Sequence, residues 1–145
     1  MAGRVDPYKG FRFLVEIDGI QQAAFTECSG LGSQIEVVEY RDGTEPNQMR
    51  KLPGKVIYPD IVLKWGVTDS RELYDWHLAV INGDLQRKNG SIVLLDDQGN
   101  EKVRWNFQDA WPSKWEGPSL DARSSRVAIE SLTLTCEKQV MAQLA

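Results

Sequence analysis

A catalytic triad with histidine as its base would have to use one residue in this chain, because His77 is the only histidine among 145 residues. A serine hydrolase would pair that imidazole with a nucleophile on a Gly-x-Ser-x-Gly turn, and the sequence contains no such segment. His77 also falls on the apolar stripe of an expected helix. That position favours a packed histidine over a catalytic base.

Two other patterns resemble chemical sites. Gly54-Lys55 looks like the end of a phosphate-binding loop, but Met49 stands where that motif needs its first glycine and Val56 where it needs Ser or Thr. Asp96-Asp97 could suggest paired catalytic carboxylates. Neighbouring side chains on a strand diverge, however, so a solvated turn is the better interpretation.

The cysteines, Cys28 and Cys136, lie far apart and have no metal-ligand spacing. We expect two reduced thiols in a protein made in the cytoplasm, with a disulfide left as an alternative. Taken with the missing motifs, this spacing leads us to expect no enzyme activity, no metal and no cofactor.

The bulk composition indicates a single globular domain over residues 1–145, with 41% apolar and 26% charged residues. The net charge of −4 argues against a specific nucleic-acid surface, which needs clustered Lys and Arg. The longest apolar runs have four residues, too few to cross a bilayer, and the N-terminal segment lacks the apolar core of a secretory signal. We therefore expect no stable membrane insertion.

Tryptophan is frequent, with five residues that could suggest base stacking or sugar binding. Few basic residues lie between them, so core packing and subunit contacts are the better interpretation. The five are Trp65, Trp76, Trp105, Trp111 and Trp115.

Strand-like segments dominate the chain. Residues 11–18 alternate apolar and polar side chains, which predicts a half-buried strand followed by a turn at Asp18-Gly19. Residues 24–28 are the expected partner of that strand. Further strands are expected at residues 34–40, 56–58, 61–65, 91–96, 102–107 and 126–137.

One helix is expected over residues 69–82, with Asp69 as its N-cap and Gly83 after its end. In the last strand the apolar parity changes halfway, which indicates either a bulge near Glu130-Ser131 or two partly covered faces. Six to eight strands and one helix predict a mainly β fold, either a barrel or a sandwich.

The connection from residue 41 to residue 55 is unusually long and polar. It carries six charges, two prolines and two glycines, and a structureless connection of this length is uncommon unless it is functional or disordered. We interpret it as an arm outside the core that contacts another molecule and is anchored by a turn at Pro53-Gly54. The candidate contact residues are Arg41, Asp42, Glu45, Met49, Arg50, Lys51, Leu52 and Lys55.

Several segments, in order, resemble one known family. They are Phe-x-Phe-x-Val-x-Ile-Asp-Gly at 11–19, Phe-x-Glu-Cys-Ser-Gly-Leu at 25–31, Val-Glu-Tyr-Arg-Asp-Gly at 38–43, Arg-Lys-Leu-Pro-Gly-Lys at 50–55, Ala-Trp-Pro-Ser-Lys-Trp-Glu-Gly-Pro at 110–118 and Val-Ala-Ile-Glu-Ser-Leu-Thr-Leu-Thr-Cys-Glu at 127–137. This set is similar to the tail tube proteins of contractile phage tails and of tail-like injection systems.

The resemblance implies a β-barrel-like subunit that forms hexameric rings, stacked into a hollow inner tube within a contractile sheath. It implies contacts with sheath, baseplate and cap proteins, with protein cargo in the lumen. It also implies that the arm makes ring-to-ring contacts. The subunit would be made and assembled in the bacterial cytoplasm, and the phage tail or tail-like particle would then be released outside the cell.

A lumen must be hydrated, so one strand face should carry small polar or acidic groups. The candidates are Glu36, Glu39, Glu130, Ser131, Thr133 and Thr135. For each of them, an ordinary solvent-facing position is an equal alternative. The alternative function is a ring-forming secreted or effector-carrying protein of a related secretion system.

Overall fold

A computed structural model describes residues 9–10, 12–21, 24–41, 43–44 and 49–142. Across these ranges the chain forms nine strands and one helix, which confirms the mainly β fold; the strand count exceeds the expected six to eight by one. The elements are β1 (Phe13–Ile17), β2 (Glu27–Ser29), β3 (Gln34–Tyr40), β4 (Arg50–Ile57), β5 (Ile61–Gly66), α1 (Glu72–Ile81), β6 (Lys88–Leu95), β7 (Glu101–Glu116), β8 (Ile129–Thr135) and β9 (Lys138–Met141).

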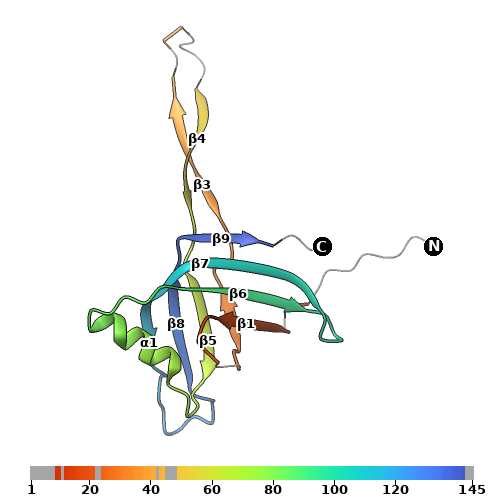
Figure 1. Cartoon of the computed structure of the whole chain (residues 1–145), viewed down its shortest axis with the longest axis vertical. Helices are drawn as coiled ribbons and strands as arrows, with labels where there is room; N and C mark the ends of the chain where they lie inside the picture. Colours follow the sequence, from red (N-terminus) through yellow and green to blue (C-terminus); the bar gives the residue numbers. More distant parts are fainter. Residues whose placement is uncertain (1–8, 11, 22–23, 42, 45–48, 143–145) are drawn as a thin grey trace, which may run out of the picture.

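Strand β7 organises the body, because its two halves pair with different neighbours. Residues 101–110 pair with β6, which in turn pairs with β1, while residues 105–108 also pair with β9. Residues 111–116 pair with β8, and the sheet continues through β5 to β2. The change of neighbours falls between Ala110 and Trp111, close to Asp109, which has φ 54. Figure 1 shows β7 curving across the body.

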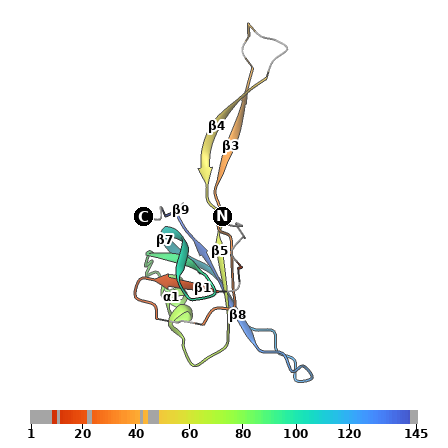
Figure 2. The same ribbon diagram turned by 90° about the vertical axis from the view of Figure 1, so that its right-hand side faces the viewer.

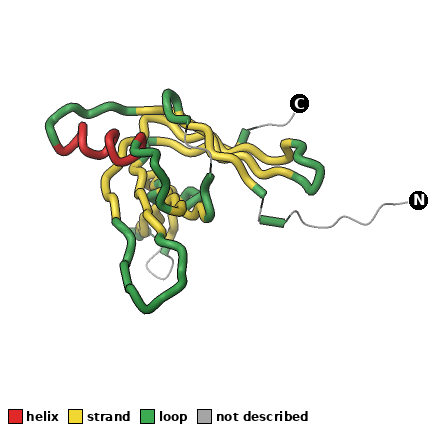
Figure 3. Tube along the Cα trace, turned by 90° about the horizontal axis from the view of Figure 1, so that it is seen from below, coloured by secondary structure: helices red, strands yellow, loops and turns green. Residues whose placement is uncertain are grey.

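The core fills the space enclosed by these strands. Ile61, Leu63 and Trp65 of β5 alternate with outward-facing residues and are at most 1% exposed. Leu132 and Leu134 of β8 are fully buried opposite them. Helix α1 adds Leu73 and Trp76 to this cluster and lies beside the strands, as Figure 3 shows in red.

The helix differs from its expected start. Its N-cap is Arg71 rather than Asp69, and no side chain caps it, so the expected capping role of Asp69 is wrong. Instead, the Ser70 amide donates to Thr68 Oγ1 at 3.2 Å in the turn before the helix. Gly83, at φ 92, ends the helix as expected, because glycine tolerates this left-handed conformation.

The expected arm is a β-hairpin. Residues 50–55 belong to β4, which pairs along its length with β3, so a structureless connection from residue 41 to residue 55 is wrong. Pro53-Gly54 forms no turn: Pro53 lies opposite Val37, beside the register shift between Ile35 and Val37. The hairpin rises away from the body in two perpendicular views (Figures 1 and 2).

One expected strand pairing and one expected strand boundary also change. β2 pairs with β5 and not with the first strand, whose ladder partner is β6. The expected strand over residues 126–137 ends at Thr135 and is followed by β9, which supplies the ninth strand. No register shift interrupts the β5–β8 pairing near Glu130; the irregularity lies between Pro112 and Lys114 of β7. Val127, which suggested the parity change, lies outside β8 and is 73% exposed.

Candidate assembly surfaces

The β3–β4 hairpin, which we call the arm, has no second layer of protein behind it in the described chain. Eight large apolar side chains on it are therefore between 44% and 60% exposed. They are Ile35, Val37, Val38, Tyr40, Met49, Leu52, Val56 and Ile57. An isolated two-stranded hairpin is marginal in water, and a contiguous apolar surface of this kind indicates a protein contact.

The predicted contact residues of the arm fall on several parts of it. Arg50, Lys51, Leu52 and Lys55 lie on β4, while Arg41 and Met49 lie next to the ends of the two strands. Glu39 lies opposite Lys51 in the ladder, so charges of both signs flank the apolar side chains. The predicted residues Asp42 and Glu45 lie outside the described residues.

A second surface, which we call the polar face, is the outer side of the sheet β7-β8-β5-β2. Ser131, Thr133 and Thr135 alternate with the buried Leu132 and Leu134 and therefore point away from the core. Thr135 Oγ1 donates to Ser113 Oγ at 2.9 Å on this side. The sequence predicted these three residues as candidates for one hydrated surface.

Charged side chains on the polar face were missed. Lys64 forms an ion pair with Glu27 at 3.4 Å, and Lys114 forms one with Glu116 at 2.6 Å. The neighbouring Lys114 ammonium lowers the pKa of Glu116. The signal was present in the sequence, because Lys64 alternates with the apolar residues of β5 and must lie opposite them.

The other predicted lumen residues lie elsewhere. Glu130 has the parity of Leu132, is half-buried and lines a hollow with Trp65 and Trp115. Glu36 and Glu39 are exposed residues of β3, on the arm. The six candidates thus belong to three places in the molecule.

The residues that the sequence offered for catalysis or metal binding make packing or hydrogen-bond contacts within the fold. His77 Nδ1 lies 3.0 Å from the Pro112 carbonyl oxygen, where α1 packs on β7. Burial, followed by the nearby Glu27 carboxylate, raises the pKa of the free Cys28 thiol to about 11, which leaves it protonated and unreactive at neutral pH. Among the described residues, no group of three or more His, Cys, Asp or Glu side chains could hold a metal ion.

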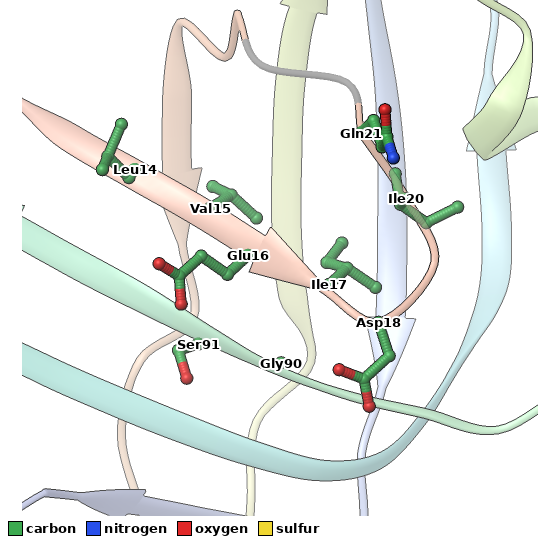
Figure 4. Close-up of a pocket in the computed structure, with 9 residues that line it drawn as sticks. All are labelled: Leu14, Val15, Glu16, Ile17, Asp18, Ile20, Gln21, Gly90 and Ser91. Carbon is green, nitrogen blue, oxygen red and sulfur yellow. The ribbon is translucent and has the colours of Figure 1, made fainter.

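A hollow of about 350 Å³ lies beside β1 (Figure 4). Its carboxylates are Glu16 and Asp18, and Arg104 Nη1 holds Glu16 Oε2 at 2.8 Å. Because Glu16 is neutralised by this cation, the hollow does not resemble a carboxylate pair for acid–base work. Across the described part of the chain, no helix is long and apolar enough to span a membrane.

A bent β body, an apolar hairpin that no second layer covers in the described chain, and a polar sheet face define a subunit suited to association with other chains. The sequence profile described as "T4-like virus tail tube protein gp19" matches residues 9–139. The chain belongs to this tail tube family.

Solved structures agree with this assignment. A chain of the sheath–tube complex of the extracellular contractile injection system PVC, in its extended state, shares 30% identity at a TM-score of 0.85, covering 95% of this chain and 93% of that one. A chain of the anti-feeding prophage cap shares 31% identity at a TM-score of 0.85, covering 99% and 96%. Comparison with curated proteins found no match.

A more distant likeness extends to Hcp1 from Flavobacterium johnsoniae, with 18% identity, a TM-score of 0.54 and coverage of 88% of this chain and 94% of that one. At this identity the likeness shows a shared fold and nothing further. The recognised family and the expected fold are thus confirmed.

Proposed function

We propose that the protein is the structural subunit of the inner tube of a contractile injection system, in which hexameric rings stack into a hollow tube. The observation that carries the proposal is the full-length similarity to chains of a sheath–tube complex, a baseplate and a tube-terminating cap. Its partners are further copies of itself, the sheath, the baseplate and the cap. The role is mechanical, so it requires no catalytic residue.

Within this function, the arm makes the contact between rings. Its apolar side chains need a cover, and a neighbouring subunit supplies one. The polar face lines the lumen, because Ser131, Thr133 and Thr135 present hydroxyl groups and the charges there are paired. A surface of this kind stays hydrated and lets cargo pass without sticking. Assembly takes place in the cytoplasm, before the particle is released.

The test is an arm-shortened variant in which Asn-Gly replaces residues 37–53. The replaced segment begins at Val37 and ends at its cross-strand partner Pro53. The remaining parts of the two strands therefore lie opposite each other and can close on a two-residue turn. We expect wild-type protein to form tubes by negative-stain microscopy and the arm-shortened variant to form folded single rings. A wild type that stays monomeric at high concentration with its sheath and baseplate present would refute the tube function. Normal tubes from the variant would refute only the stacking role of the arm.

The second candidate is a secreted or effector-carrying ring, favoured only by the shared fold with Hcp1. Such a protein would form discrete rings without dependence on a sheath. Co-purification with a contractile sheath separates the two functions.

A further inference from the structure

The arm joins the body through two short segments, residues 30–33 before β3 and residues 58–60 after β4, which we call the base of the arm. The two segments approach closely, because a Cβ on Gly30 would lie 1.9 Å from the Asp60 carbonyl oxygen. Gly30 also has φ 92, a conformation that favours glycine. Glycine at this position therefore lets the two segments meet.

The sheet of the arm does not fix the direction of the arm. In the described chain β3 and β4 form a two-stranded sheet of their own, and the ladder of the seven-stranded sheet does not extend into it. The eight residues of β4 span about 26 Å at the usual rise of a strand. A swing of about 10° at the base would move the far end by about 5 Å, the spacing of two paired strands. The contacts at the base therefore decide where the arm points.

The side-chain amide of Gln139 makes such contacts. Its Oε1 accepts from the Gly32 N–H at 3.2 Å, and its Nε2 donates to the carbonyl oxygens of Gly30 at 3.1 Å and Pro59 at 2.9 Å. Gly30 and Gly32 belong to one segment of the base and Pro59 to the other. One amide thus binds both segments.

Burial makes this amide selective for one arrangement of the base. Gln139 is 8% exposed, and in the described part of the chain Ser91 is the other buried polar side chain. A buried amide whose donors and acceptor are all paired holds its neighbours in one geometry. A change in the direction of the base would leave these groups unpaired in the interior.

Strand β9 carries Gln139 and anchors it to the body. Gln139 lies opposite Phe107 in the β7–β9 ladder, and Phe107 is 1% exposed in the core. β9 lies beside the base of the arm in two perpendicular views (Figures 1 and 2). A continuous set of contacts therefore runs from the core through β7 and β9 to both segments of the base.

We propose that Gln139 is a positioning residue for tube assembly, because its amide fixes the direction in which the arm leaves the body. The inference rests on the proposed stacking function and adds the residue that orients the arm before a second ring arrives. An arm held in one direction has little freedom left to lose on binding. A released arm is competent for only part of the time, which weakens assembly in proportion.

The first test is Gln139→Met, which keeps the length of the side chain and removes all three hydrogen bonds to the base. Spin labels on Glu39→Cys in the arm and Asp75→Cys in α1, both at exposed positions, report the direction of the arm as a distance. Labelled subunits are diluted with unlabelled ones. Every protein compared carries Cys28→Ala and Cys136→Ser, and the serine keeps a hydrogen-bonding group beside residue 139.

We expect one narrow distance distribution with Gln139 in place and a broad one in Gln139→Met. Gln108→Met, at an exposed position of the same β7–β9 ladder, is the matched control and should keep the narrow distribution. If the released arm is competent for about a tenth of the time, Gln139→Met raises the protein concentration needed for tubes about tenfold. Gln108→Met should assemble like wild type.

A lower melting temperature of Gln139→Met together with a narrow distance distribution and normal assembly would overturn the proposal. Gln139 would then stabilise the fold without orienting the arm. The tube function would stand, because wild-type tubes are scored in the same experiment. If the wild type formed no tubes, the tube function would fail, and the spin-label distances would still decide whether Gln139 orients the arm.

A second test uses the wild-type protein, so it does not depend on the folding of a variant. Because the Gly32 N–H donates to Gln139 Oε1, it should exchange with deuterium as slowly as the amides of the β7–β9 ladder. Exchange is followed by mass spectrometry of the peptide that contains Gly32. Exchange at the rate of an unprotected loop amide would show that the Gln139 contact is open in solution, and it would overturn the proposal.

Discussion

At the scale of single residues, the side chains that suggested chemistry serve the fold. His77 fastens α1 to β7 through the Pro112 carbonyl, and Cys28 faces Leu63 across the β2–β5 ladder. An apolar setting disfavours the thiolate, which is why burial raises the pKa of Cys28. A thiol held in this way resists oxidation and metal binding.

This thiol gives the protein a specific pH dependence. The pKa of Cys28 rises from 9.0 to about 11, so the fold favours the protonated form. The corresponding stability is complete below pH 9 and is lost as the pH rises through about 11. We expect the difference in unfolding free energy between wild type and Cys28→Ala, measured in denaturant, to shrink over that interval.

Ser29→Ala, on the exposed neighbour, is the control and should show a pH-independent difference. An equally constant difference for Cys28→Ala would mean that the thiol titrates near its usual value. Slow alkylation of Cys28 at pH 8, relative to unfolded protein, is an independent readout.

At the scale of elements, the sequence was most reliable where an element has one buried face. The strand over residues 61–65 was expected from its composition, and β5 occupies 61–66 with strict alternation of burial. The strands expected at residues 91–96 and 102–107 correspond to the antiparallel strands β6 and β7, which extend further. In each case the pattern records which side of the element meets the core.

The hairpin structure of the arm escaped prediction for a physical reason. β4 carries Arg50, Lys51, Pro53 and Lys55, and a ribbon exposed on both faces places no constraint on side-chain alternation. The polar pattern was therefore interpreted as a loop. The pairing of β2 with β5 was missed for a different reason. These strands are far apart in the sequence, and local periodicity does not encode which distant strands pair. The polar face was only partly predicted, because strand parity alone does not say which strands are adjacent.

The charges of the arm lead to a second prediction. Lys51→Glu should weaken ring stacking, and the loss should depend on salt, because exposed ion pairs contribute roughly 0.2–1 kcal/mol each and are screened. The loss of this contact is repeated in every subunit of a ring. The measurement is the protein concentration needed for tube formation at low and high salt.

A charge swap shows whether weakened stacking in Lys51→Glu comes from a lost contact with a neighbouring subunit or from a lost contact inside the hairpin. Lys51 lies opposite Glu39, so Glu39→Lys combined with Lys51→Glu restores opposite charges at this cross-strand position of the arm. If Lys51 contacts a neighbouring subunit, the swap leaves stacking impaired. Full recovery would instead place the importance of Lys51 inside the hairpin.

At the scale of the whole molecule, the arm and the polar face point in different directions. The arm rises from one end, the end of β5 and the start of β8 lie at the other, and the sheet that carries the polar face lies between them. Helix α1 packs on the core side of that sheet, with Leu73 and Trp76 among its buried residues. A subunit arranged this way can stack through its ends while one side faces the lumen and the helix side faces outward.

That arrangement predicts how accessible each side is in the assembled tube. Thr133→Cys on the polar face should react with a bulky maleimide polymer in single rings and become protected in tubes. Asp75→Cys, on the exposed side of α1, should react equally in both and is the matched control. Both changes are made with Cys28 and Cys136 replaced by alanine, and labelling is scored by the mobility shift on a denaturing gel. Undiminished labelling of Thr133→Cys in tubes would place the polar face on the outside, and the lumen would then have to be formed by another surface of the subunit.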